Sequence, residues 1–218
     1  RLAANMRHRA ASGHPWIYAT EAAEITGDYV PGDIVEVVDA RGRFLGRGYI
    51  NPASQILVRI LTRDQSEEIN RTFFEKRIRA ALDYRNRVVR GADSYRLIFA
   101  EADFLPALVV DKFGEYLAVQ TLALGIDKFK DLITNILDEL LKPAGIYERN
   151  DAAVRELEGL PLKTGFLKGP FDPVIEINEN GLVFLADLAG GQKTGYFLDQ
   201  RENRMALEGI AAGARVLD

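Results

Sequence analysis

The sequence has 218 residues, of which 47% are hydrophobic and 28% charged, and its formal net charge is −4. This composition excludes an intrinsically disordered chain and is typical of a soluble globular protein with one or two domains. The absence of cysteine excludes disulfides, cysteine-based zinc sites and a thiolate nucleophile within this chain, and it fits a cytoplasmic location. No apolar run approaches the ~18 residues of a membrane span, so no membrane partner is expected.

Short strand patterns dominate the first region, residues 1–66. Residues 34–38, 43–49 and 55–61 are apolar or alternate in polarity, and turn residues separate them. Short strands joined by tight turns predict a small β-barrel.

A helix opens the second region, residues 70–170. Apolar residues recur at helical spacing over 70–90, and Thr72 and Glu75 fit a capping box at the start. Basic residues outnumber acidic ones on the other faces of this helix. Such a run indicates either a solvated helix face or contact with RNA phosphates.

The rest of the second region alternates between strands and a further helix. The strands are predicted at 95–99, 106–111, 115–121 and 145–149. Asp127 is predicted to cap the helix, which ends at Lys142-Pro143. This order predicts a mixed α+β layer.

The third region, residues 171–218, begins with a predicted hairpin whose turn is Asn180-Gly181. A helix is predicted over 199–212, capped by Asp199 and stopped by Gly213. Residues 214–218 then look like the first strand of a parallel sheet, and the alternative is a C-terminal tail. The predicted fold class is therefore α+β, with a small barrel, a mixed central domain and the start of a further layer.

The third region also contains the tripeptide Gly190-Gly191-Gln192. The same tripeptide occurs in peptide-release factors, but a match of three residues is frequent by chance. Its glycines favour a mobile lid loop instead.

Several motifs together resemble one known family. They are HPWIY at 14–18, GRGYINP at 46–52, FAEADFLPALVVDKFG at 99–114, ERND at 148–151 and GGQKTGYFLDQRENR at 190–204, followed by GARVLD. They resemble the PUA-domain-containing, S-adenosylmethionine (SAM)-dependent methyltransferases that make 5-methylcytosine in large-subunit ribosomal RNA. The resemblance spans nearly the whole chain.

The resemblance implies a PUA-like RNA-binding domain at 1–66, a central α+β domain at 70–170, and a segment at 171–218 that leads into a Rossmann-like methyltransferase domain. The family continues with a Gly-rich loop and a catalytic cysteine, and this sequence has neither. The resemblance thus implies the N-terminal portion of an enzyme, with no catalytic residue of its own and no activity alone. Ribosomal RNA is the implied partner, and homodimerisation of the parent protein is left open.

The resemblance also implies which residues approach the cofactor SAM. These are Tyr196, Phe197, Gln200, Arg201 and Asp218. The alternative is a capped helix start in which Arg201 is solvated. Binding of SAM by this portion alone is not expected, because most of the pocket wall belongs to strands beyond it.

The implied RNA contacts lie mainly in the first region. Arg43, Arg47 and Tyr49 alternate along one strand, and with Asn51 they resemble the RNA-reading surface of a PUA domain. Lys193 is a further candidate for a phosphate contact. The alternative is a solvated strand face.

Metal binding is not expected. The only two histidines are His8 and His14, and the carboxylates around them lack the spacing of a metal site. Two other functions stay open: a self-sufficient PUA-containing RNA adaptor, and a structural or assembly domain without an RNA role.

Overall fold

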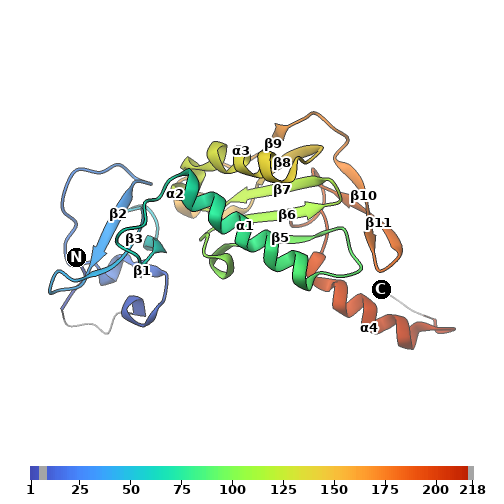
Figure 1. The fold of residues 1–218 in the computed structure, drawn as a ribbon, viewed down its shortest axis with the longest axis horizontal. Coiled ribbons are helices and arrows are strands. Elements are labelled where there is room, and N and C mark those ends of the chain that lie inside the picture. The colour runs from blue at the N-terminus through green and yellow to red at the C-terminus, as the bar shows by residue number, and fades with distance from the viewer. Residues whose placement is uncertain (5–8, 216–218) are drawn as a thin grey trace.

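A computed structural model describes residues 1–4 and 9–215 of the chain. Its first part is a four-stranded antiparallel sheet in the order β1-β4-β3-β2, seen on the left of Figure 1. The strands are β1 (Trp16–Tyr18), β2 (Ile34–Val38), β3 (Phe44–Ile50) and β4 (Ile56–Thr62). The three predicted strands are confirmed to within one residue, whereas β1 is too short for a periodic pattern.

The central part is a five-stranded sheet in the order β5-β6-β7-β8-β9. Only β7 and β8 pair in parallel, so the sheet is mixed and the predicted α+β class is confirmed. The strands are β5 (Tyr95–Phe99), β6 (Leu108–Phe113), β7 (Tyr116–Thr121), β8 (Gly145–Asn150) and β9 (Lys163–Lys168), and the helices are α1 (Arg71–Val88), α2 (Leu124–Lys128) and α3 (Lys130–Leu141).

Strand alternation divides the central sheet into two buried faces. On β6, Leu108 and Val110 pack beneath α1 and α3, whereas Phe113 packs against the hairpin on the opposite face. Figure 1 shows the two helices running along the sheet. The central part therefore has three layers, with helices on one side and the C-terminal hairpin on the other.

Two predicted helix starts are wrong. Asn70, not Thr72, caps α1, because its side chain accepts a hydrogen bond from the Phe73 backbone N–H. Asp127 lies inside α2, where its carboxylate accepts hydrogen bonds from Thr121 and Arg155. A break at Phe129 separates α2 from α3, so one predicted helix is two.

The hairpin consists of β10 (Val174–Glu179) and β11 (Leu182–Asp187), and α4 (Arg201–Ala211) follows it. Asn180 and Gly181 have φ values of 55° and 86°, as a two-residue type I′ turn requires, which confirms the predicted turn. The helix α4 ends just before Gly213, whose φ is 73°. The predicted strand 214–218 falls largely on residues 216–218, which lie outside the described ones.

The first sheet docks on the central part through buried polar contacts. The Tyr49 hydroxyl donates to the Pro106 carbonyl at 2.9 Å. The Glu158 carboxylate accepts from Asn51 at 2.9 Å, from Ser54 at 2.6 Å and from Arg59 at 2.9 Å. Three donors of the first sheet thus converge on one carboxylate of the central part.

The Glu158 carboxylate is ionised at this junction. Burial opposes its negative charge, but the hydrogen bonds from Ser54 and Asn51 and the nearby Arg59 guanidinium outweigh burial and hold the pKa of Glu158 below its ordinary value. A buried ion pair with further hydrogen bonds fixes the relative position of the two parts.

Candidate functional site

The segment between β11 and α4 lies across the hairpin-side face of the central sheet and is anchored there at two buried points. Arg149, which is 4% exposed, donates to the carbonyls of Leu188 at 2.8 Å and Gly191 at 2.9 Å. Thr194 donates its hydroxyl to Asp111, a carboxylate that is fully buried in β6. These contacts give the segment a fixed course.

Asp111 also holds Arg96 of β5. The guanidinium donates through Nε and Nη2 to the two carboxylate oxygens, both at 2.9 Å. This bidentate pair places the Arg96 side chain at the edge of the segment. Asp111 of β6 therefore connects Arg96 of β5 with Thr194 of the segment through hydrogen bonds.

The glycines of this segment allow close packing. A Cβ on Gly191 would stand 2.5 Å from the Asp187 carbonyl oxygen, and Gly195 has a φ of 133°. The Asp187 carboxylate accepts hydrogen bonds from the backbone N–H groups of Ala189 and Gly190. The interpretation of these glycines as hinges of a mobile lid is therefore not supported, because they serve a tight, hydrogen-bonded turn.

A cavity of about 440 Å³ lies between this segment, β5 and the end of α1. Its walls combine aromatic and charged side chains. They are contributed by Val89, Ser94, Tyr95, Arg96, Phe99, Lys193, Tyr196, Leu198, Asp199, Arg201 and Glu202. Apolar walls with a few convergent polar groups are typical of a small-molecule or nucleotide site.

The structure brings part of the predicted cofactor set to this cavity. Tyr196 and Arg201 line it, together with the predicted RNA contact Lys193. Phe197 is 37% exposed and does not line the cavity, although Lys193 lies 4.6 Å from its ring centre. Gln200 is exposed, and its amide oxygen accepts from Asn203.

Asp218 lies outside the described residues. The expected capping role of Asp199 is wrong, because its carboxylate instead accepts two hydrogen bonds from Lys193, at 2.7 and 2.8 Å. The hydrogen bond from Lys193 lowers the pKa of Asp199. This exposed pair closes one side of the cavity.

Two buried donors at the cavity have no partner among the described residues: the Tyr196 hydroxyl and Arg201 Nε. The Arg201 Nη2 atom donates to the Arg90 carbonyl and to Asn180. Burial and the Glu179 carboxylate raise the pKa of Tyr196, so its hydroxyl keeps its proton. A ligand with a carboxylate or hydroxyl group, such as the amino-acid and ribose parts of SAM, fits these donors.

The structure places the four predicted RNA contacts of the first sheet in different environments. Tyr49 and Asn51 are each 1% exposed, because they are buried in the junction with the central part. Arg47 is mostly buried and donates to Glu36 and to the carbonyls of Gln65 and Glu67. Arg43 precedes β3, and its exposed side chain pairs with Asp39 at 2.6 Å. Of these four, only Arg43 is well exposed to a ligand in solution.

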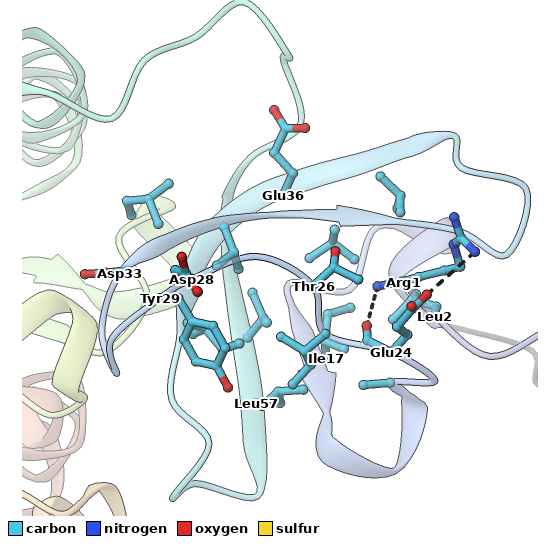
Figure 2. Close-up of a pocket in the computed structure, with 18 residues that line it drawn as sticks. Arg1, Leu2, Ile17, Glu24, Thr26, Asp28, Tyr29, Asp33, Glu36 and Leu57 are labelled. Atoms are coloured by element: carbon cyan, nitrogen blue, oxygen red, sulfur yellow. Dashed lines mark hydrogen bonds and ion pairs between the residues drawn. The ribbon is translucent and has the colours of Figure 1, made fainter.

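A second cavity, of about 460 Å³, lies in the first sheet and is shown in Figure 2. Glu24, Asp28, Asp33 and Glu36 line it, and Arg1, the one basic residue among the described residues of its wall, pairs with Glu24 at 3.7 Å. Carboxylates repel phosphate, so this cavity does not fit an RNA backbone.

Sequence reasoning missed Arg96, Asp111 and Arg149 as the anchors of the site. Asp111 ends the predicted strand 106–111, where an acidic residue in an apolar run is a signal that could have been followed. Within the described residues, no group of histidine or acidic side chains could hold a metal ion, and no helix is long and apolar enough to cross a membrane.

Residues 1–63 match the family of PUA-like domains. The similar curated proteins include Ribosomal RNA large subunit methyltransferase I of Cronobacter sakazakii, 38% identical over 208 residues, and that of Klebsiella pneumoniae, 40% identical over 208 residues. Each match covers 94% of this chain and 52% of the relative. The chain therefore spans about half the length of the curated relatives that it matches.

Two solved structures share the fold. One, described as a methyltransferase complexed with SAH, has a TM-score of 0.75 and 19% identity, covering 91% of this chain and 50% of that chain. Another, described as a SAM-dependent methyltransferase from Streptococcus mutans, has a TM-score of 0.77 and 19% identity, covering 97% and 54%. At this identity the similarity concerns the fold.

Proposed function

We propose that this chain is the RNA-binding and substrate-positioning part of a SAM-dependent ribosomal RNA methyltransferase that acts on C5 of cytosine. The observation that carries the proposal is the 40% identity over 208 residues to a large-subunit rRNA methyltransferase. The match covers 52% of that relative. We propose a Rossmann-like methyltransferase domain as the remaining half.

Exposed apolar side chains near the C-terminal end support a further domain. Val183 and Leu185 on β11 are 65% and 64% exposed, and Leu207 and Ile210 on α4 are 52% and 75% exposed. Figure 1 places the hairpin and α4 at the same end of the molecule. Exposed apolar side chains that gather at one end of a molecule are often covered by another domain or chain.

The chemistry assigns catalysis to that further domain. Carbon C5 of cytosine is a weak nucleophile, and addition of a cysteine thiolate at C6 makes it reactive enough to take a methyl group. The thiolate leaves again once a base has removed the C5 proton. This chain contains no cysteine, so we expect no methyl transfer by the chain alone.

For the cofactor, we propose that this chain supplies one wall of the site. Bound SAM supplies the methyl group, and the two unpartnered donors of Tyr196 and Arg201 hold its polar end. Gln200 and Phe197 are exposed just before α4 and do not line the cavity, so we propose them only as contacts to a part of the ligand that extends beyond it. Asp218 is retained as a proposed contact from the first strand of the further domain.

For the RNA, we propose phosphate contacts by Arg43 and Lys193, whose side chains are 74% and 42% exposed. The basic residues of α1 could extend this surface, but several of them already pair with carboxylates, as Arg79 does with Glu75. Arg43 and Lys193 pair with Asp39 and Asp199 as well, so the proposed RNA surface consists of a few exposed cations that exchange a carboxylate for a phosphate, rather than of one strongly basic face.

The decisive experiment measures RNA binding and methyl transfer with the same 218-residue chain. Large-subunit rRNA fragments are titrated at increasing salt, and methyl transfer from labelled SAM is followed in parallel. We expect binding that weakens steeply with salt, because released counterions drive phosphate contacts, and no transfer above background. Methyl transfer by this chain alone would contradict the assignment of catalysis to another domain.

The same experiment separates the alternative functions. Absence of salt-dependent RNA binding would favour a structural or assembly domain. A stand-alone RNA adaptor predicts instead that adding the C-terminal half of a related enzyme produces no methyl transfer to the bound RNA.

A further inference from the structure

A third cavity, of about 410 Å³, lies at the junction of the first sheet and the central part, away from the candidate site. Its walls come from the end of β4, from α1 and from the turn Ala100–Asp103 with Phe104. Four of its side chains combine an aromatic face with charges: Arg63, Arg77, Glu101 and Phe104.

Phe104 presents a large apolar ring to solvent at this cavity. Its side chain is 70% exposed, and its backbone has a φ of 58°, a left-handed conformation that is unfavourable for a bulky residue. Arg77 holds the conformation by donating to the Phe104 carbonyl at 2.8 Å, while its guanidinium stacks 4.2 Å from the Phe73 ring centre. Strained, exposed residues that the surroundings hold in place concentrate at binding sites.

Arg63 is a positioned cation at the same cavity. Its Nη1 atom donates to the carbonyls of Ala10 and Leu45, and its Nη2 atom donates to that of His14, all at 2.9 Å. Among the described residues it has no carboxylate partner. Three of its five N–H groups are used in this way, so two remain to bind an anion.

Glu101 supplies an acceptor beside the aromatic ring. Its Oε1 atom accepts a hydrogen bond from the indole N–H of Trp16 at 2.8 Å, which fixes the carboxylate in the cavity wall. Among the described residues, its other oxygen has no hydrogen-bond partner. A carboxylate oriented in this way can accept from the exocyclic amino group of a nucleobase.

We propose that this junction cavity binds one nucleotide of single-stranded RNA whose base carries an exocyclic amino group. The base stacks on Phe104, its amino group donates to Glu101, and the adjacent phosphate pairs with Arg63. The inference rests on the proposed RNA-binding role and adds a base preference to it: cytosine or adenine is bound better than uracil, which has no amino group to donate.

Trp16 provides a built-in reporter because it is the only tryptophan of the chain and contacts Glu101 directly. The experiment titrates the full chain with short oligocytidine, oligoadenosine and oligouridine, and with free CMP. It records both the anisotropy of labelled RNA and the emission of Trp16. We expect tighter binding of oligocytidine and oligoadenosine than of oligouridine, and a change in Trp16 emission on binding. CMP supplies the base and one phosphate, so it should compete with oligocytidine, but more weakly, because it lacks the further phosphates that contact the rest of the chain.

Substitutions of residues that line the cavity test whether RNA binds there. Phe104→Gly keeps the left-handed backbone and removes the ring, so we expect roughly tenfold weaker oligocytidine binding. Arg63→Gln should weaken binding of all three oligonucleotides and reduce its salt dependence. Leu157→Ala, at an equally exposed apolar residue, and Lys142→Gln, an equal loss of charge, should leave binding unchanged.

The outcomes distinguish this site from the general function. If the unchanged chain bound no RNA, the RNA-binding role would fall together with this site. If RNA bound but Phe104→Gly changed neither affinity nor the Trp16 response, only the junction site would be overturned. Equal binding of oligouridine and oligocytidine would remove the role of Glu101.

Discussion

Thr194 donates a hydrogen bond to Asp111 across 83 positions of sequence, and this contact anchors the segment before α4 on the central sheet. Asp111 is fully buried and also pairs with Arg96, so its two oxygens hold both a strand neighbour and the segment. Asp111 is thus one of the two buried anchors of this segment, and Arg149 is the other.

Thr194→Val tests this anchor. Valine keeps the shape of threonine but removes the hydroxyl, so Asp111 loses a donor and the free energy of unfolding should fall by about 2 kcal/mol. Urea denaturation measures the change. Thr194→Ser keeps the hydroxyl and should cost less than the valine variant; equal losses for the two would show that the methyl group contributes as much as the hydrogen bond.

Glu158→Gln tests the junction between the first sheet and the central part. The variant removes the negative charge and leaves the guanidinium of Arg59 buried without its ion-pair partner, so we expect a loss of about 3 kcal/mol in the free energy of unfolding. Glu156→Gln is the matched control, because Glu156 lies in the same turn and is exposed. A similar stability of both variants would contradict the role of the buried carboxylate.

The same carboxylate predicts a pH dependence. The folded pKa of Glu158 lies below its ordinary value of 4.5, so its contribution to stability is complete above that pH and is lost as the pH falls through the folded pKa. The stability difference between the parent chain and Glu158→Gln should therefore shrink under acid conditions. Urea denaturation of both proteins from neutral pH to pH ~3 measures it, and a constant difference would refute the linkage.

Gly125→Ala tests the close approach of the two parts. A Cβ at Gly125 would stand 2.0 Å from the Tyr49 ring, so the ring or the helix must shift and we expect a loss of about 2 kcal/mol. Gly209→Ala is the control in α4, where a Cβ meets nothing within 4 Å and alanine should stabilise the helix by up to about 1 kcal/mol. Thermal unfolding of the two variants should shift in opposite directions.

The sequence predicted those elements whose signal is local. The span of α1, the hairpin turn at Asn180-Gly181 and most strands followed from periodicity and turn residues, because neighbouring positions determine these features. The short strand β1 and the exposed strand β9 lacked such a pattern. The start of α1 was misplaced because Thr72 and Asn70 are both suitable caps, and only the backbone geometry distinguishes them.

The residues of the candidate site were harder to predict because their roles depend on contacts distant in sequence. Tyr49 and Arg43 lie in the same stretch, yet one is buried under α2 and the other is exposed. Likewise, nothing near Asp111 in the sequence indicates that Thr194 will meet it. Periodicity shows which residues share a face of a strand, but not what that face packs against.

The convergence of Asn51, Ser54 and Arg59 on Glu158 has a thermodynamic consequence for any strand of RNA that touches both parts of the molecule. The entropy lost in orienting two binding modules is incurred when the chain folds, not when the ligand arrives. Weak individual contacts, spaced at a fixed separation, can then add up to useful affinity.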